Sequence, residues 1–147
     1  MKISKSSAWD QSRIFSFLSE NTIPVRLAVI QDKHPLICSV WFSVDAETLV
    51  IRCVSHGKSQ LIKSLMADPN VGFEIALNAP PYKGVRGKGS ATLTKENVSD
   101  TLHEVIVRFL GDTTSNLARW LLGRADEEYV IEITPSWITS WDYSERM

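Results

Sequence analysis

Three β-branched segments in the N-terminal half constrain the fold of this chain most strongly: residues 25 to 32, 35 to 45 and 48 to 55. Turn-forming stretches separate them, so we expect an antiparallel meander. Within the second segment apolar residues occupy both alternating positions, at Ile37, Val40, Trp41 and Phe42. A sheet with one solvated face would alternate apolar with polar residues, so this pattern indicates that both faces are covered. It favours a closed or half-closed barrel.

Helices should flank this sheet, because four stretches carry apolar residues at helical spacing. We predict helices over residues 8 to 20, 58 to 67, 98 to 110 and 115 to 123. The third should begin after Asn97, which is expected to be its N-cap, and should stop at Gly111.

Three later segments extend the sheet: residues 71 to 77, 85 to 94 and 128 to 143. A bend or bulge is predicted near Gly84, Gly87 and Gly89, and Pro135 should interrupt the last strand. Together the elements predict a mostly β fold of the α+β class. A length of 147 residues suits a single domain with one core, over residues 1 to 147.

Charge and composition argue against several classes of partner and location. The chain has 16 basic and 17 acidic side chains, a formal net charge of −1, and so no positive field that would attract nucleic acid. Cys38 and Cys53 lie in strand-like runs without metal-ligand spacing, which indicates a reducing cytoplasm and no metal. Runs of about 18 apolar residues are absent, so we expect a cytoplasmic protein that does not span a membrane.

The triplet Gly57-Lys58-Ser59 is similar to the end of a nucleotide-binding P-loop and lies between a strand and a helix. A P-loop needs a glycine five residues earlier, and Arg52 stands there, so the P-loop interpretation fails. Two interpretations remain open. Lys58 is either a solvated lysine or part of an anion site at the start of the helix, where free amides and the helix dipole favour negative charge. Arg52 could add a bidentate contact to the same anion.

The order of several segments resembles the pyridoxamine 5′-phosphate oxidase-like family of FMN-binding split barrels. The resemblance rests on Val40-Trp41-Phe42, on the strand, lysine and helix that end in Asp68-Pro69-Asn70-Val71, on the strand Tyr82 to Ala91 and, more weakly, on Ile138 to Tyr143. It covers roughly residues 8 to 142. It implies a six-stranded antiparallel split β-barrel with flanking helices, in a homodimer that holds two FMN molecules between its subunits.

The resemblance also implies which residues bind the cofactor. The family's phosphate-binding lysine falls on Lys58, and the residues that accompany it are Ser55, His56, Arg52 and, in a looser alignment, Arg26. The flavin ring would lie along the backbone of Ser39, Val40 and Trp41. Side chains that would cover the cofactor or substrate from the partner subunit are Tyr82, Arg86, Trp137 and Trp141. The tryptophans have an alternative interpretation as ordinary core or interface aromatics.

The expected activity is that of an FMN-dependent oxidoreductase acting on a small molecule by hydride transfer. The sequence shows no triad, carboxylate pair or metal cluster, so no catalytic residue is identified and the flavin would carry the redox chemistry. True pyridoxamine phosphate oxidases have a further segment with arginine and histidine, which does not follow Tyr143, so vitamin B6 oxidation is not expected. The alternatives are a deazaflavin-dependent reductase and a non-catalytic dimeric module that binds flavin or haem.

Overall fold

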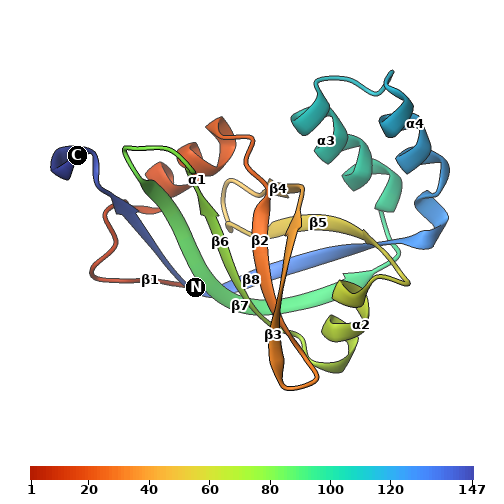
Figure 1. Ribbon diagram of the computed structural model, residues 1–147, viewed down its shortest axis with the longest axis horizontal. Coiled ribbons are helices and arrows are strands. Elements are labelled where there is room, and N and C mark those ends of the chain that lie inside the picture. The colour runs from red at the N-terminus through yellow and green to blue at the C-terminus, as the bar shows by residue number, and fades with distance from the viewer.

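One sheet organises the chain, and its strand order is β3-β2-β6-β7-β8-β5-β4 (Figure 1). The computed structural model describes residues 1–147. Its strands are β1 (Lys2–Ile3), β2 (Val25–Gln31), β3 (His34–Val40), β4 (Phe42–Val44), β5 (Ile51–His56), β6 (Asn70–Ala76), β7 (Lys83–Thr94) and β8 (Glu128–Asp142). The short β1 runs parallel to β8, and all other neighbours are antiparallel.

The sheet curls into a half-barrel because one continuous segment, residues 34–44, belongs to both of its edges. β3 pairs with β2, whereas β4, which follows after Trp41 alone, pairs with β5 at the other end of the strand order. The predicted mostly β barrel with flanking helices is therefore confirmed at this level. The sheet has eight strands, and the expected number of six is reached only if β3 and β4 count as one and the two-residue β1 is omitted.

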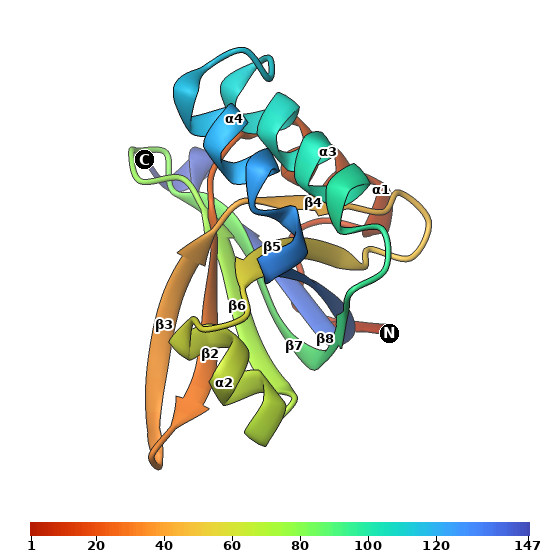
Figure 2. The same cartoon turned by 90° about the vertical axis from the view of Figure 1, so that its right-hand side faces the viewer.

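Four α-helices flank the sheet: α1 (Gln11–Glu20), α2 (Gln60–Ala67), α3 (Val98–Leu110) and α4 (Asn116–Gly123). Asp10, Ser59 and Ser115 are N-caps whose side chains accept a backbone N–H bond from the first turn of α1, α2 and α4. Figure 2 shows α3 and α4 side by side at one end of the molecule and α2 beside the β2–β3 hairpin. None of the helices is long and apolar enough to cross a membrane.

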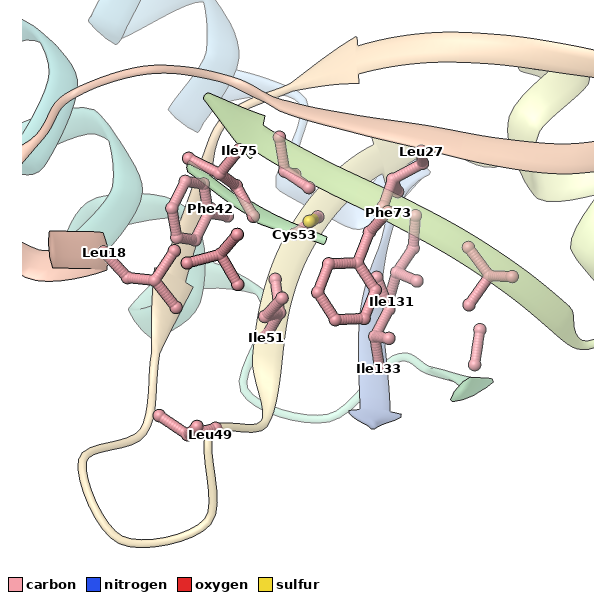
Figure 3. Close-up of a cluster of buried hydrophobic side chains, with 14 of the residues drawn as sticks. Leu18, Leu27, Phe42, Leu49, Ile51, Cys53, Phe73, Ile75, Ile131 and Ile133 are labelled. Atoms are coloured by element: carbon pink, nitrogen blue, oxygen red, sulfur yellow. The ribbon is translucent and has the colours of Figure 1, made fainter. Parts of the chain in front are cut away.

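The main core fills the inside of the half-barrel with 21 buried apolar residues. Figure 3 shows part of it, with Phe42 and Phe73 among aliphatic side chains and the thiol of Cys53. Each such large side chain, once fully buried, contributes roughly 1.5–3 kcal/mol to folding. A smaller cluster joins α3 and α4 to Val130 of β8 and fixes the two helices on the outer side of the sheet.

The expected meander of the first three strands is only partly correct. β2 and β3 form the predicted hairpin, with Asp32 and Lys33 both at positive φ, as a tight two-residue turn between twisted strands requires. β5, however, pairs with β4 and β8 and lies far from β2 in the strand order. It also begins at Ile51 and not at residue 48, because the preceding residues form a turn in which Leu49 has a φ of 56°.

The predicted helix over residues 98 to 110 is confirmed over the same span, and Asn97 occupies the N-cap position as expected but does not cap the helix with its side chain. Asn97 adopts a left-handed conformation with a φ of 54° and its side chain makes no capping hydrogen bond. Gly111 does end the helix, with a φ of 88° that suits glycine.

Pro135 does not end the last strand, since β8 continues through it to Asp142. The register against β7 shifts at this point: Gly89 lies opposite Pro135 and Lys88 opposite Trp137, which leaves Ser136 as the extra residue of a bulge. Ser136 Oγ donates to the carbonyl of Lys88 at 3.1 Å. A Cβ at position 89 would collide with the carbonyl of Thr134, so glycine permits this close approach. The bulge predicted near the glycines is confirmed.

Candidate functional site

A cavity of about 440 Å³ opens where the bend of residues 34–44 meets β5, α3 and α4. Its strand side is formed by Ser39, Val40, Trp41, Ser55, His56 and Ser59. Five of these residues are among those that the family resemblance implicates in cofactor binding. They come from two segments that the barrel brings together, because the bend after β3 carries the chain to the edge at which β4 pairs with β5.

Trp41 is the residue at this bend, and its ring is held by a helix. It stacks on Phe109 of α3 with ring centroids 5.3 Å apart and an interplanar angle of 13°. Stacked aromatic pairs contribute about 0.5–1.5 kcal/mol beyond the area that they bury. The bend is thus fixed by packing, and the backbone of residues 39 to 41 lies at the cavity in a defined position.

Lys58 lies in the turn between β5 and α2, beside the cavity. It precedes the N-cap Ser59 and therefore stands outside the first helical turn in which the sequence placed it. The Ser59 hydroxyl accepts from Ile62 N at 3.2 Å and lies 3.0 Å from the hydroxyl of Ser55. The side chain of Lys58 is exposed and has no ion-pair partner, so its charge is available to an anion.

His56 fixes this turn through both ring nitrogens. Its Nδ1 accepts the backbone N–H of Lys58 at 3.0 Å, so the proton resides on Nε2, which donates to Glu127 Oε2 at 2.7 Å. The hydrogen bond from His56 is the main reason that the pKa of Glu127 lies below its ordinary value, and the charges of Lys58 and Arg124 lower it further. His56, Lys58 and Arg124 thus all favour the ionised form of Glu127.

The helix side of the cavity is apolar and is formed by Leu102, Val105, Leu117 and Leu121. At its base Arg124 Nε lies 2.8 Å from Glu128 Oε1, and the guanidinium lies over the ring of Trp120 at 3.8 Å. The sequence alone does not single out this ion pair. Its only signal was the spacing of four residues between opposite charges, which is common on exposed surfaces and does not reveal that Glu128 is only 2% exposed.

Arg52 does not join Lys58 at this cavity. Its side chain lies on β5 and its Nε donates to Glu132 Oε2 at 3.0 Å, on the neighbouring strand β8. Arg52 and Glu132 are direct partners in the β5–β8 register, so the pair stabilises the sheet surface. The structure thus separates the two cations for which the sequence suggested a shared anion.

The remaining predicted residues lie on or beside the uncovered outer face of the sheet. A hollow of about 580 Å³ there is lined by side chains of β2, β3, β6, β7 and β8, including Arg26, Ile37, Arg86 and Trp137. Arg26 contacts Glu74 at 3.7 Å and donates to Asn78 Oδ1 at 2.6 Å.

Trp141 and Tyr82 lie beyond the lining of this hollow. The Arg86 guanidinium stands over the ring of Trp141 at 4.5 Å, which is a cation–π arrangement. Tyr82 is 43% exposed in the loop before β7, and its carbonyl accepts the N–H of Tyr143. The structure therefore divides the predicted residues into two groups, one at the cavity and one on the outer face, with Ser39 paired with Arg26 in the β2–β3 register.

Neither cysteine has the surroundings of a nucleophile. Cys53 is fully buried in the main core, and burial raises the pKa of its thiol far above the ordinary value. Cys38 packs against the same core, and burial raises its pKa as well. Both thiols remain protonated at neutral pH and serve as small apolar groups, as the sequence indicated for Cys53.

Sequence comparisons give no relative: no protein-family model and no curated protein matches the chain. Solved structures do match. Conserved hypothetical protein Rv2991 from Mycobacterium tuberculosis is 22% identical, with a TM-score of 0.81 over 99% of this chain and 92% of that one. An F420 reductase is 20% identical, with a TM-score of 0.70 over 84% and 94% of the two chains.

A structure from Listeria innocua, named as a candidate pyridoxamine 5′-phosphate oxidase, is 17% identical and has a TM-score of 0.66 over 91% of this chain and 98% of its own. Likeness at this level of identity shows a shared fold. The family resemblance derived from the sequence is confirmed to that extent.

Proposed function

Because the chain has the split-barrel fold of the pyridoxamine 5′-phosphate oxidase-like proteins, we propose that it binds a flavin, specifically FMN, and acts as an oxidoreductase. One observation carries this proposal. Ser39, Val40 and Trp41 converge with Ser55 and His56 on a single cavity, although a turn and a strand separate the two groups along the chain. These are the positions that the resemblance assigns to the flavin ring and to the approach to its phosphate.

The cavity fits a flavin in size and in chemistry. Its volume of about 440 Å³ lies within the range of roughly 300–1,000 Å³ that small-molecule sites occupy. The apolar wall of α3 and α4 suits an aromatic ring system, and the backbone of residues 39 to 41 offers hydrogen-bonding groups to its polar edge. A bound flavin supplies hydride transfer, so the protein has to bind and orient it and to restrict water.

The phosphate of FMN would lie at the turn before α2. Lys58 supplies a free positive charge there, and the N-terminus of α2 adds its dipole. His56 orients the turn by accepting the N–H of Lys58. Each of these residues binds or positions the cofactor, and none is required to transfer a proton.

A homodimer would complete this site. Ile37 and Ile30 are 67% and 46% exposed on the outer face of β3 and β2, where they would be buried by a second copy of the same surface. We propose that this face is the subunit interface and that it brings Arg86, Trp141 and Tyr82 of one subunit towards the flavin of the other. The free thiols of Cys38 and Cys53 suit the cytoplasm as the location.

The visible spectrum of the purified protein tests the flavin proposal directly. We expect a yellow protein, or an apoprotein that binds added FMN and quenches its fluorescence. We also expect NADH or NADPH to bleach the bound flavin, since an oxidoreductase needs a donor. A colourless protein that leaves FMN fluorescence unchanged would refute the proposal. Tight flavin binding without reduction by either nicotinamide would favour the non-catalytic module, and a Soret band would favour haem.

A deazaflavin is the second candidate cofactor, because the fold matches that of an F420 reductase with a TM-score of 0.70. The same cavity would hold it, since the two ring systems have nearly the same shape. A competition titration separates the two candidates. If coenzyme F420 displaces bound FMN and binds more tightly than FMN, the deazaflavin is the preferred ligand. FMN that is not displaced would support our first choice.

A further inference from the structure

Arg124, at the C-terminal end of α4, is held on two sides before any ligand binds. Its Nε lies 2.8 Å from Glu128 Oε1, and its guanidinium lies 3.8 Å from the centroid of the Trp120 ring. Glu128 is only 2% exposed, so the carboxylate that holds the arginine is fixed within the protein. An arginine with one edge and one face restrained loses little conformational entropy when its other edge binds an anion.

The contact between Arg124 and Glu128 uses only part of the arginine. Arg124 Nε and Glu128 Oε1 are both buried, yet neither has a partner in hydrogen-bond geometry, so their contact is an ion pair without a directed bond. The terminal nitrogens of Arg124 make no hydrogen bond to the chain. Because Nε and Oε1 already face each other, the donors of Arg124 that remain for a ligand in the cavity are its terminal nitrogens.

Arg124 lies at the same end of the cavity as the turn that carries Lys58, and we call this charged region, formed by His56, Lys58, Arg124 and Glu128, the zone. Arg124 and Glu128 line the cavity together with His56 and Ser59, which flank Lys58 in the chain. Two carboxylates face the zone as well, and both are already engaged: Glu127 by the bond from His56 and Glu128 by Arg124. The groups that remain without a partner are therefore the ammonium of Lys58 and the terminal nitrogens of Arg124. Both are cationic donors, so the ligand that would bind them is an anion.

We propose that Arg124 is a second ligand of the cofactor's phosphate group, whose other side faces Lys58. The terminal nitrogens of an arginine form a planar fork that matches two phosphate oxygens, whereas a lysine provides a point charge. Glu128 and Trp120 hold the fork in position. This inference rests on the proposed binding of FMN, because it assumes that the phosphate of the flavin lies at the turn of Lys58.

The test compares two ligands that differ only in the phosphate, FMN and riboflavin. Fluorescence titrations of the apoprotein should show tighter binding of FMN to the wild type. In the double variant Arg124→Gln/Glu128→Gln the affinity for FMN should fall by about 10- to 100-fold, the range for a hydrogen bond to a charged group, while riboflavin affinity changes less than about threefold. Changing both residues leaves no unpaired buried charge, and circular dichroism and thermal unfolding would confirm that the variant is folded.

Arg119→Gln is the matched control on the same helix, because Arg119 donates to the carbonyl of Thr114 through Nε and Nη2 and does not line the cavity. It removes the same charge and should leave the FMN preference unchanged. A double variant that keeps the full preference for FMN over riboflavin would overturn the role of Arg124 and leave the flavin proposal intact. A wild type that binds both flavins equally, or neither, would overturn the phosphate site and with it this inference.

Discussion

The two halves of the segment 34–44 have similar apolar patterns but different surroundings. In β4, Phe42 is fully buried and Ser43 is 4% exposed, because α1 and α3 pack against this half. In β3, Ile37 remains 67% exposed on the outer face of the sheet, although its neighbours Leu36 and Cys38 pack against the core. The segment that the sequence predicts as one strand is therefore covered on both faces only in its second half, β4.

This difference shows that an apolar residue at an outward position does not reveal what covers it. At β4 the cover is another part of the same chain. At β3 no part of the chain buries Ile37, so a second molecule is the natural candidate. Substitutions should therefore act differently in the two halves and in the two groups of site residues that meet at the bend between them.

The largest expected effect is the loss of a core side chain from the β4 half. Phe42→Ala should lower the free energy of unfolding by about 3–5 kcal/mol, because the buried ring leaves a cavity that its neighbours cannot fill. Urea denaturation would measure it, with Met66→Ala, at a position that is 58% exposed, as the control with a change of less than about 0.5 kcal/mol. Equal effects at the two positions would contradict the assignment of Phe42 to the core.

Substitution in the β3 half should change association and not folding. Ile37→Glu would place two like charges in a two-fold interface, so the dimer should weaken by at least about 100-fold while the subunit stays folded. Analytical ultracentrifugation would measure the dissociation constant, and Met66→Glu would report on the added charge alone. A wild type that is monomeric at high concentration would disprove the interface at β3.

A third prediction concerns the two ends of β5, where the sequence suggested a shared anion and the structure separates the cations. Lys58→Ala should weaken FMN binding by about tenfold, since a charged contact to the phosphate is lost. Arg52→Ala should change it by less than about twofold, because Arg52 is engaged with Glu132. Flavin fluorescence titrations of both variants measure the contrast, and a larger loss for Arg52 would reverse the assignment.

The fold was largely predictable because most elements carry local signals. The apolar spacing of residues 98 to 110 and the glycine at position 111 define α3 without reference to the rest of the chain. The pairing of β5 with β4 and β8 has no such signal, because it depends on closure of the sheet around the core. The glycines predicted the bulge, but the continuation of β8 through Pro135 had no signal, since a proline in a strand indicates an interruption more often than a continued ladder.

The candidate site was predictable only in part, and for a similar reason. A family resemblance marks the segments of Ser39 to Trp41, Ser55 and His56, and the structure brings these residues to one cavity. The sequence does not mark Arg124 and Glu128, because only the structure shows that Glu128 is buried and that Arg124 pairs with it. A glutamate at the start of a strand normally faces solvent, and only the packing of α3 and α4 over β8 encloses this one.

The smallest expected effect lies at the turn beside the cavity, where His56 lowers the pKa of Glu127. A carboxyl group whose pKa is lower in the folded state stabilises the fold at pH values above its ordinary pKa, and that contribution is lost as the pH falls through the folded value. Glu127→Gln should therefore be less stable than the wild type at pH 6, and the difference should shrink below the ordinary value of 4.5. Urea unfolding of both proteins between pH 6 and pH 3 measures it, with the exposed Glu96→Gln as control. A difference that grows on acidification would contradict the charge-assisted hydrogen bond from His56, because protonation of the carboxylate removes the negative charge that strengthens the bond.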